Sequence, residues 1–248
     1  MTSFMGLKLD CLTMGQSLIR CEELIQLRNT QHVVINAAKV VSALENEALR
    51  QVVNSCDLVN ADGMSVVWSA RILGIKVPER VTGIDLMYEL VRLSAAKGYS
   101  IFLLGAEAET VKTVAEKFVS EGANVIGHRD GFWDSSEEAQ LVDGIATLGP
   151  DILFLAIPSP QKEFFLAKHL SNLNVGLAMG VGGSFDVVSG LTKRAPRIMQ
   201  VTGLEWLFRL SQEPRRMFKR YLIGNSKFAW LTAKALMKNI FERAQGSK

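Results

Sequence analysis

The stretch DILFLAIPSPQKEFFLAKHLSNLNVGLAM, residues 151–179, contains two apolar runs with a helical segment between them. The first run, Asp151–Ile157, is apolar at every position after its first residue, which is typical of a strand covered on both faces. Gln161–Leu170 has the period of a helix, and Val175–Met179 is a second β-rich run. A strand, a helix and a strand in this order predict a βαβ unit with parallel strands.

The same alternation runs through most of the chain before residue 191. The predicted strands are His32–Asn36, Asp57–Asn60, Ser100–Leu104 and Asn124–Gly127, and the predicted helices are Lys39–Asn54, Met64–Leu73, Ile84–Ala96, Glu107–Ser120 and Glu137–Leu148. Residues 1–191 are therefore predicted to form an α/β core. It should contain a mostly parallel, Rossmann-like sheet with helices on both faces.

The end of the chain differs from the rest in charge. Residues 192–248 contain 13 Lys and Arg against 3 Asp and Glu, a net charge of +10, whereas residues 1–191 contain 15 and 22, a net charge of −7. A basic segment of this kind is typical of a surface that meets phosphate, in nucleic acid or in an anionic membrane. We therefore predict a second unit, a basic helical appendage over residues 192–248.

The clearest pattern in the appendage is an amphipathic helix over Pro214–Leu222, with Gly224-Asn225 as its expected end. Its cationic arc holds Arg215, Arg216, Lys219 and Arg220, and a second basic stripe follows at Lys227, Lys234 and Lys238. Such a helix fits an anionic membrane surface, and the alternative is a helix packed on the core with a solvated charged face. No apolar run approaches the roughly 18 residues of a spanning helix, so the sequence predicts a soluble or peripheral protein and not an integral one.

Residues that follow the predicted strands are the candidates for a binding site, because open parallel sheets bind ligands at the carboxyl ends of their strands. They are Asn36, Asp62-Gly63, Gly105, Asp130-Gly131, Pro160-Gln161 and Gly180–Gly183, the last continuing into Ser184-Phe-Asp186. Backbone amides of glycine-rich turns in front of a helix suit a phosphate or a diphosphate. Neither Gly105 nor Gly180–Gly183 lies in a dinucleotide or P-loop fingerprint, so a plain tight turn is the alternative.

Asp62 is the carboxylate whose position best suits catalysis. It lies between a short strand and a helix, where it either caps the helix or acts as a general base at the ligand-binding edge. Asp85 poses the same choice, and the sequence favours a cap there. A zinc site, a metal-assisted nucleotide-sugar site and a serine hydrolase are disfavoured, because the chain has no D-x-D or G-x-S-x-G motif and no metal-ligand spacing among His32, His128 and His169.

Several blocks of sequence come in the order seen in one protein family. They are Asn60–Trp68, Arg80–Leu86, Phe102–Gly105, Gly127–Gly131, Gly180–Asp186, Lys193–Pro196, Gly203–Leu210 and Glu213–Arg216. With these blocks the chain resembles the WecG/TagA/CpsF glycosyltransferases, bacterial enzymes that build cell-surface polymers. The resemblance extends from about Leu9 to Phe228.

The resemblance implies a compact α/β glycosyltransferase with a C-terminal appendage, peripheral on the cytoplasmic face of the inner membrane. Such an enzyme moves N-acetylmannosamine, its uronic acid or glucose from a UDP-sugar onto an undecaprenyl-diphosphate-linked sugar, with inversion. We expect no cofactor and no metal ion, no nucleic-acid partner, and an anionic membrane surface as a partner. Association with further copies of the chain is left open.

The resemblance also implies roles for particular residues. It gives Asp62 as the general base and Asn36 as the family's strand-end asparagine. The tail arginines that would engage the lipid diphosphate fall on Arg209, Arg215, Arg216 and Arg220. The other expected substrate-binding residues are Gly63, Gly105, Gln161, Glu163, Gly180, Gly182, Gly183, Asp186 and Arg194.

Two positions depart from the family pattern. Val34 stands where some members have threonine, and Lys162 stands where the family has glutamine. Lys162 either contacts a carboxylate or phosphate of the substrate, which would change the donor sugar, or is a solvated lysine at a helix start. Two other functions are alternatives to the glycosyltransferase. One is an oxidoreductase with a nucleotide cofactor, and the other is a nucleic-acid-binding module that binds through the basic tail.

Overall fold

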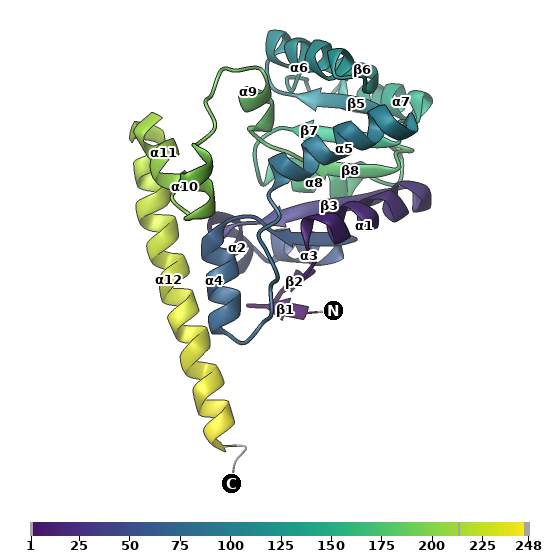
Figure 1. The fold of residues 1–248 in the computed structure, drawn as a ribbon. Helices are drawn as coiled ribbons and strands as arrows, with labels where there is room; N and C mark the ends of the chain where they lie inside the picture. Colours follow the sequence, from purple (N-terminus) through teal and green to yellow (C-terminus); the bar gives the residue numbers. More distant parts are fainter. Residues whose placement is uncertain (1, 213, 246–248) are drawn as a thin grey trace.

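The computed structural model describes the backbone of residues 2–212 and 214–245, and it describes their side chains except at Val201, Arg209, 215–223 and 240–245. The central element of this part of the chain is a six-stranded sheet in which every neighbouring pair of strands is parallel (Figure 1). The strands are β3 (Thr30–Ile35), β4 (Leu58–Ala61), β5 (Ser100–Gly105), β6 (Asn124–Arg129), β7 (Ile152–Ala156) and β8 (Leu177–Gly180), in the order β4-β3-β8-β7-β5-β6. The predicted α/β class is confirmed.

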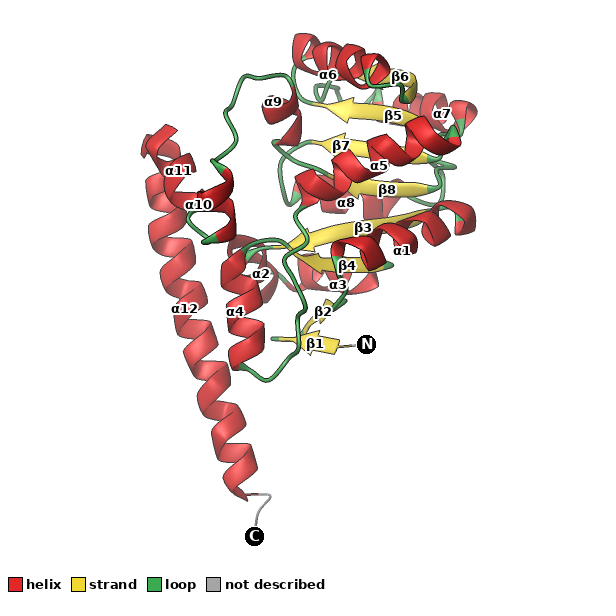
Figure 2. Ribbon diagram, in the orientation of Figure 1, coloured by secondary structure: helices red, strands yellow, loops and turns green. Residues whose placement is uncertain are grey.

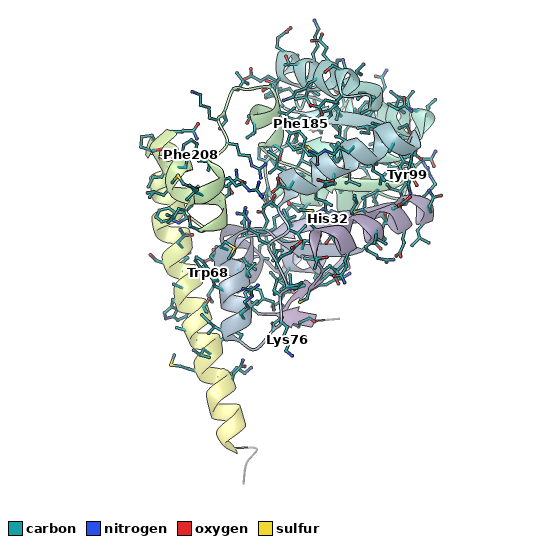
Figure 3. All side chains as sticks on the ribbon, viewed as in Figure 1. His32, Trp68, Lys76, Tyr99, Phe185 and Phe208 are labelled. Atoms are coloured by element: carbon teal, nitrogen blue, oxygen red, sulfur yellow. The ribbon has the colours of Figure 1, made fainter. Side chains whose placement is uncertain are left out.

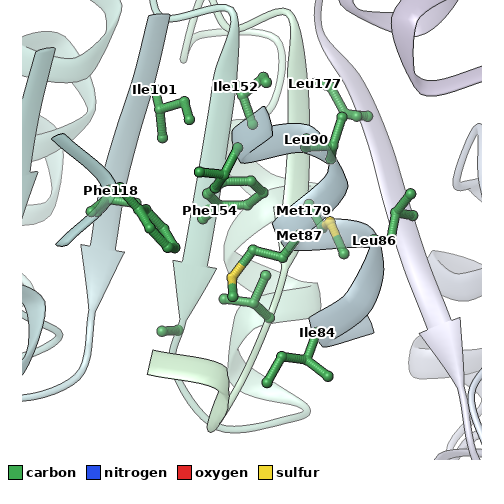
Figure 4. Close-up of a cluster of buried hydrophobic side chains, with 14 of the residues drawn as sticks. Ile84, Leu86, Met87, Leu90, Ile101, Phe118, Ile152, Phe154, Leu177 and Met179 are labelled. Carbon is green, nitrogen blue, oxygen red and sulfur yellow. The ribbon is translucent and has the colours of Figure 1, made fainter. Parts of the chain in front are cut away.

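Helices cover both faces of this sheet (Figure 2). On one face lie α1 (Met14–Leu27), α5 (Gly83–Lys97), α6 (Ala108–Ser120) and α9 (Ser184–Val188). Figure 4 shows Met87 and Leu90 of α5 packed over Phe154 of β7. On the other face, α2 (Ala37–Glu45) and α3 (Glu47–Ser55) cover β3 and β4, while α7 (Glu138–Leu148) and α8 (Gln161–His169) cover β5, β7 and β8. Burial on both faces explains why the strands are apolar without alternation.

The helix predicted over residues 39–54 is two helices, so this prediction was wrong. Asn46 ends α2 with an extended backbone (φ −128°, ψ 105°), and its side chain accepts a hydrogen bond from the backbone N–H of Leu49 in α3. Asparagine is a preferred N-cap because its side-chain oxygen satisfies a donor that the helix leaves unpaired.

Residues 2–27 form structure that the sequence pattern did not predict. A hairpin of β1 (Thr2–Phe4) and β2 (Leu7–Leu9) precedes α1, whose start is a capping box between Thr13 and Gln16. After the hairpin, Asp10 exchanges two hydrogen bonds with Val59, one through its backbone N–H and one through its carboxylate, each 2.8 Å long. Val59 belongs to the edge strand β4. Asp10 therefore provides hydrogen-bond partners for the backbone N–H and C=O groups of Val59 that point away from the sheet.

Helices α10 (Arg197–Val201), α11 (Glu205–Gln212) and α12 (Pro214–Gln245) follow the core. The predicted end at Gly224-Asn225 is wrong, because α12 continues through both residues. Phe228 is only 5% exposed and its ring packs on that of Phe4, with 6.5 Å between centroids. A glycine in a helix interior costs only about 1 kcal/mol relative to alanine. The burial of Phe228 against Phe4 outweighs this cost and favours a continuous helix.

Helix α12 lies along the outer side of α2 and of α4 (Met64–Ile72). The hydroxyl groups of Ser69 and Thr232 are hydrogen-bonded at 2.9 Å, and Lys227 pairs with Glu45 at 2.6 Å. In the described part of the chain, no helix has both the length and the apolar character that crossing a membrane requires.

Candidate active site

The parallel pairing of β3 and β4 brings Asn36 and Asp62 to one edge of the sheet. Ile35 is in register with Ala61, so the next residue of each strand leaves the sheet at the same level. The backbone N–H of Asp62 donates to the carbonyl oxygen of Ile35 at 2.8 Å. A β-carbon on Gly63 would lie 3.9 Å from the Cβ of Asn36, which shows how closely the two turns approach. The half-buried Asp62 therefore lies beside Asn36, as the sequence predicted for strand ends.

Asp62 is not the N-cap residue of the helix that follows it. The N-cap of α4 is Gly63, whose φ of +118° suits glycine alone. The prediction of Asp62 as the N-cap residue is therefore wrong. Asn36, in contrast, does cap a helix, because its side chain accepts from the backbone N–H of Lys39 at 3.0 Å.

Asp85 is hydrogen-bonded to the N-cap residue at the start of α5. Thr82 is the N-cap, and its hydroxyl donates to Asp85 while accepting from the backbone N–H of the same residue. The carboxylate also pairs with Arg194 at 2.7 Å. Arg194, an expected substrate-binding residue, thereby ties the segment after α9 to the start of α5.

The end of β8 and the three-residue turn that follows it gather several of the expected substrate-binding residues. Gly180 is the last residue of β8, Gly182 and Gly183 lie in the turn, and Asp186 follows in α9 with a carboxylate oxygen 3.5 Å from where a β-carbon of Gly183 would be. Gly182 has a φ of +54°. The side chain of Lys162 lies against the turn, with its ammonium nitrogen 3.2 Å from where a β-carbon of Gly182 would be.

Glu163 lies beneath this turn and is 1% exposed. It forms an ion pair with Lys39 of α2 at 2.5 Å, and the ammonium group of Lys162 lies 3.9 Å from the same oxygen. Burial alone would raise the pKa of Glu163, but the two ammonium groups outweigh it and hold the pKa below the ordinary 4.5. Gln161, the neighbouring residue, is exposed at the start of α8.

Gly105 marks the carboxyl end of β5, and it is tightly packed. It has a φ of +121°, and a β-carbon there would lie 2.6 Å from the backbone of Ala156. Gly131 packs against this turn in the same way, since its β-carbon would lie 3.1 Å from the Cα of Gly105. Glycine at these positions lets three chain segments approach one another.

Beside this packed turn, an open hollow of about 400 Å³ is lined by Gly131, Phe132, Trp133, Asp134 and Glu137. Phe132 is 71% exposed. Asp130-Gly131 was predicted from the sequence as part of a binding site, whereas the two aromatic residues that follow were not. The signal was present in the sequence, because two large aromatic residues within four residues of a strand end are unusual in a loop that faces water.

The appendage reaches the same side of the molecule as Asp62. A β-carbon on Gly203, in the turn before α11, would lie 2.9 Å from the side chains of Met64 and Trp68 in α4, and Figure 3 shows Trp68 on the side of the core next to α12. Arg80 pairs with Glu205 at 3.3 Å. Arg209 lies in α11 and Arg215, Arg216 and Arg220 in α12, but their side chains fall outside the described residues.

His32 is a buried titratable group that lies away from this site. It is 1% exposed, and its Nε2 is hydrogen-bonded to Asn60, whose amide donates to Ser17 of α1. Burial lowers the pKa of His32 to about 4, so the ring is neutral at pH 7. Among the described residues, no group of three or more His, Cys, Asp and Glu could hold a metal ion.

A parallel α/β sheet with glycine turns, buried cations and a carboxylate at the carboxyl edge is typical of enzymes that bind nucleotides. The chain matches the glycosyl transferase WecG/TagA/CpsF family over residues 2–242, and it belongs to this family. It is therefore a glycosyltransferase of cell-surface polysaccharide biosynthesis.

Proposed function

We propose that the protein transfers N-acetylmannosamine, its uronic acid or glucose from a UDP-sugar to an undecaprenyl-diphosphate-linked sugar, with inversion. The observation that carries this proposal is the position of Asp62, a half-buried carboxylate that adjoins Asn36 at the carboxyl edge of the sheet. Membership of a glycosyltransferase family favours this function over the oxidoreductase and nucleic-acid alternatives.

In the proposed reaction, the carboxylate of Asp62 takes the proton of the acceptor hydroxyl. The acceptor oxygen forms a bond to the anomeric carbon from the face opposite the leaving group. The bond between that carbon and the diphosphate oxygen breaks, and UDP leaves with the electron pair. Asn36 and the turn Gly180–Gly183 lie where they could hold the donor, and backbone amides and cations would stabilise the departing charge without a metal ion.

A turnover assay tests this function. We expect UDP release from one member of a panel of UDP-sugars only when a short-chain prenyl-diphosphate-linked sugar is present, and we expect EDTA to leave the rate unchanged. Release that needs a divalent cation would contradict the metal-free mechanism. Release that does not need the lipid-linked acceptor would contradict the proposed acceptor, and no release with any donor would contradict the proposed transfer itself.

We also propose that the appendage holds the protein on the cytoplasmic face of the inner membrane. Exposed apolar side chains, among them Trp206, Leu207, Trp230 and Met237, occur on α11 and α12 together with Lys227, Lys234 and Lys238. The ammonium group of Lys234 lies over the ring of Trp230, 5.3 Å from its centroid. Aromatic and basic side chains together suit the headgroup region of an anionic bilayer.

Vesicle co-sedimentation tests this surface. The protein should bind vesicles that contain anionic lipid, bind neutral vesicles much less, and lose binding as salt screens the charges. A variant with Trp230→Ala and Lys234→Ala should bind less than one with Lys112→Ala and Lys168→Ala, two lysines of the core helices α6 and α8. Binding to an oligonucleotide but not to anionic vesicles would contradict the membrane assignment and favour the nucleic-acid alternative.

A further inference from the structure

Three charged side chains are buried among the described residues, and they lie together. Lys39, Lys162 and Glu163 are 7%, 8% and 1% exposed. Lys39 comes from the start of α2 and the other two from the start of α8, so both helices begin at the carboxyl edge of the sheet. Burying charge costs free energy, and buried charges near a binding edge are candidates for function rather than stability.

The position of Lys162 is fixed by its surroundings. Its aliphatic stem lies across Gly180, where a β-carbon would come within 2.9 Å of its Cδ. Its ammonium group lies beside Gly182 and 3.9 Å from Glu163. Any side chain at residue 180 would therefore displace Lys162. This burial contradicts the alternative of a solvated lysine at the helix start.

The ammonium group thus lies at a glycine turn that opens at the ligand-binding edge. Gly182 has a left-handed backbone, and turns of this kind form concavities that bind anions. A buried ammonium group beside such a turn adds a full positive charge in a region of low dielectric, where its effect on an anion is large.

We infer that Lys162 binds an anionic oxygen group of the donor, either the diphosphate of the UDP moiety or a carboxylate on the sugar, and that in the second case it sets the preference for an acidic sugar. The inference rests on the proposed function, since it requires a UDP-sugar at this edge. Glu163 and Lys39 are positioning residues in this arrangement, because Glu163 holds Lys162 against the turn while Lys39 neutralises Glu163.

Calorimetric titration of the full chain tests this role, with Lys162→Met as the main variant. Methionine keeps an unbranched stem over Gly180 and removes the charge. Lys168→Met is the matched control, because Lys168 lies on the same helix with its side chain 68% exposed. The probes are uridine, UDP, UDP-glucose and UDP-glucuronic acid, and Lys162→Gln serves as a second variant if the first does not fold.

If Lys162 binds the diphosphate, the variant should bind UDP roughly 10- to 100-fold more weakly while its affinity for uridine is unchanged. If it binds a sugar carboxylate, UDP affinity should be unchanged and a preference for UDP-glucuronic acid over UDP-glucose should be lost. Affinities that match the unsubstituted protein for every probe would overturn the inference, as would an equal loss for uridine and UDP. Failure of the unsubstituted protein to bind UDP would instead contradict the proposed function.

Discussion

Replacing Asp62 by asparagine should lower turnover by about 10²- to 10⁴-fold, the usual effect of removing a general base. Asparagine has nearly the same shape as aspartate but does not take a proton. The fold should be unchanged, because the contact of residue 62 with Ile35 uses the backbone N–H and because Gly63, and not Asp62, is the N-cap residue of α4. The measurements are UDP release under saturating substrates and a guanidinium unfolding curve for each protein.

The control for this variant is Asp143→Asn, an exposed carboxylate on α7. It changes the net charge by the same amount, and turnover should stay at the level of the unsubstituted protein. Near-normal turnover in Asp62→Asn would remove Asp62 from the mechanism. The proposed base would then have to be sought among other groups at the edge of the sheet.

Replacing Glu163 by leucine should lower the free energy of unfolding by about 3–5 kcal/mol, the cost of removing one partner of a buried ion pair. Lys39 would be left as a buried cation without its carboxylate. The double variant with Lys39→Met and Glu163→Leu should recover part of this loss, because Lys39 is then no longer a buried charge without a partner while Lys162 still lacks its carboxylate. Chemical denaturation of the three proteins measures both effects.

An exposed pair provides the comparison. Glu23 forms an ion pair with Arg20 on α1 with its side chain 56% exposed, and Glu23→Gln should cost less than about 1 kcal/mol. The pH dependence gives a second check. The pKa of Glu163 is lower in the folded protein than the ordinary 4.5, so its stabilisation should be complete above pH 4.5 and be lost as the pH falls below it. A Glu163→Leu protein as stable as the unsubstituted one would contradict the buried-pair interpretation.

The sequence was sufficient to place Asn36 and Asp62 at one edge because parallel strands share the direction of their carboxyl ends. That inference needed only the alternation of strands and helices, and no knowledge of the strand order. The same reasoning placed Gly105 and Gly180–Gly183 at this edge. The structure distinguishes them, because Gly105 is packed against Ala156 whereas the turn after β8 adjoins Lys162.

The partner of Glu163 could not be predicted in this way. Lys39 is 124 residues away in the chain and belongs to a different helix, and nothing in its local sequence indicates burial. The length of α12 was missed for a similar reason. Gly224-Asn225 is a local stop signal, whereas the contact of Phe228 with Phe4 joins opposite ends of the chain. Both the pairing of Glu163 and the length of α12 therefore depend on a contact between residues that are far apart in the sequence.

The hydrogen bonds between Asp10 and Val59 also limit how copies of this protein could associate. They occupy the outer N–H and C=O groups of Val59, and the C=O of Ala61 further along β4 accepts from Val81. A strand from another copy could not pair along β4, because these backbone groups are already hydrogen-bonded. The opposite edge of the sheet is β6. Dimerisation by extension of the six-stranded sheet, within the described part of the chain, would therefore have to run through β6, close to the hollow that Phe132 lines.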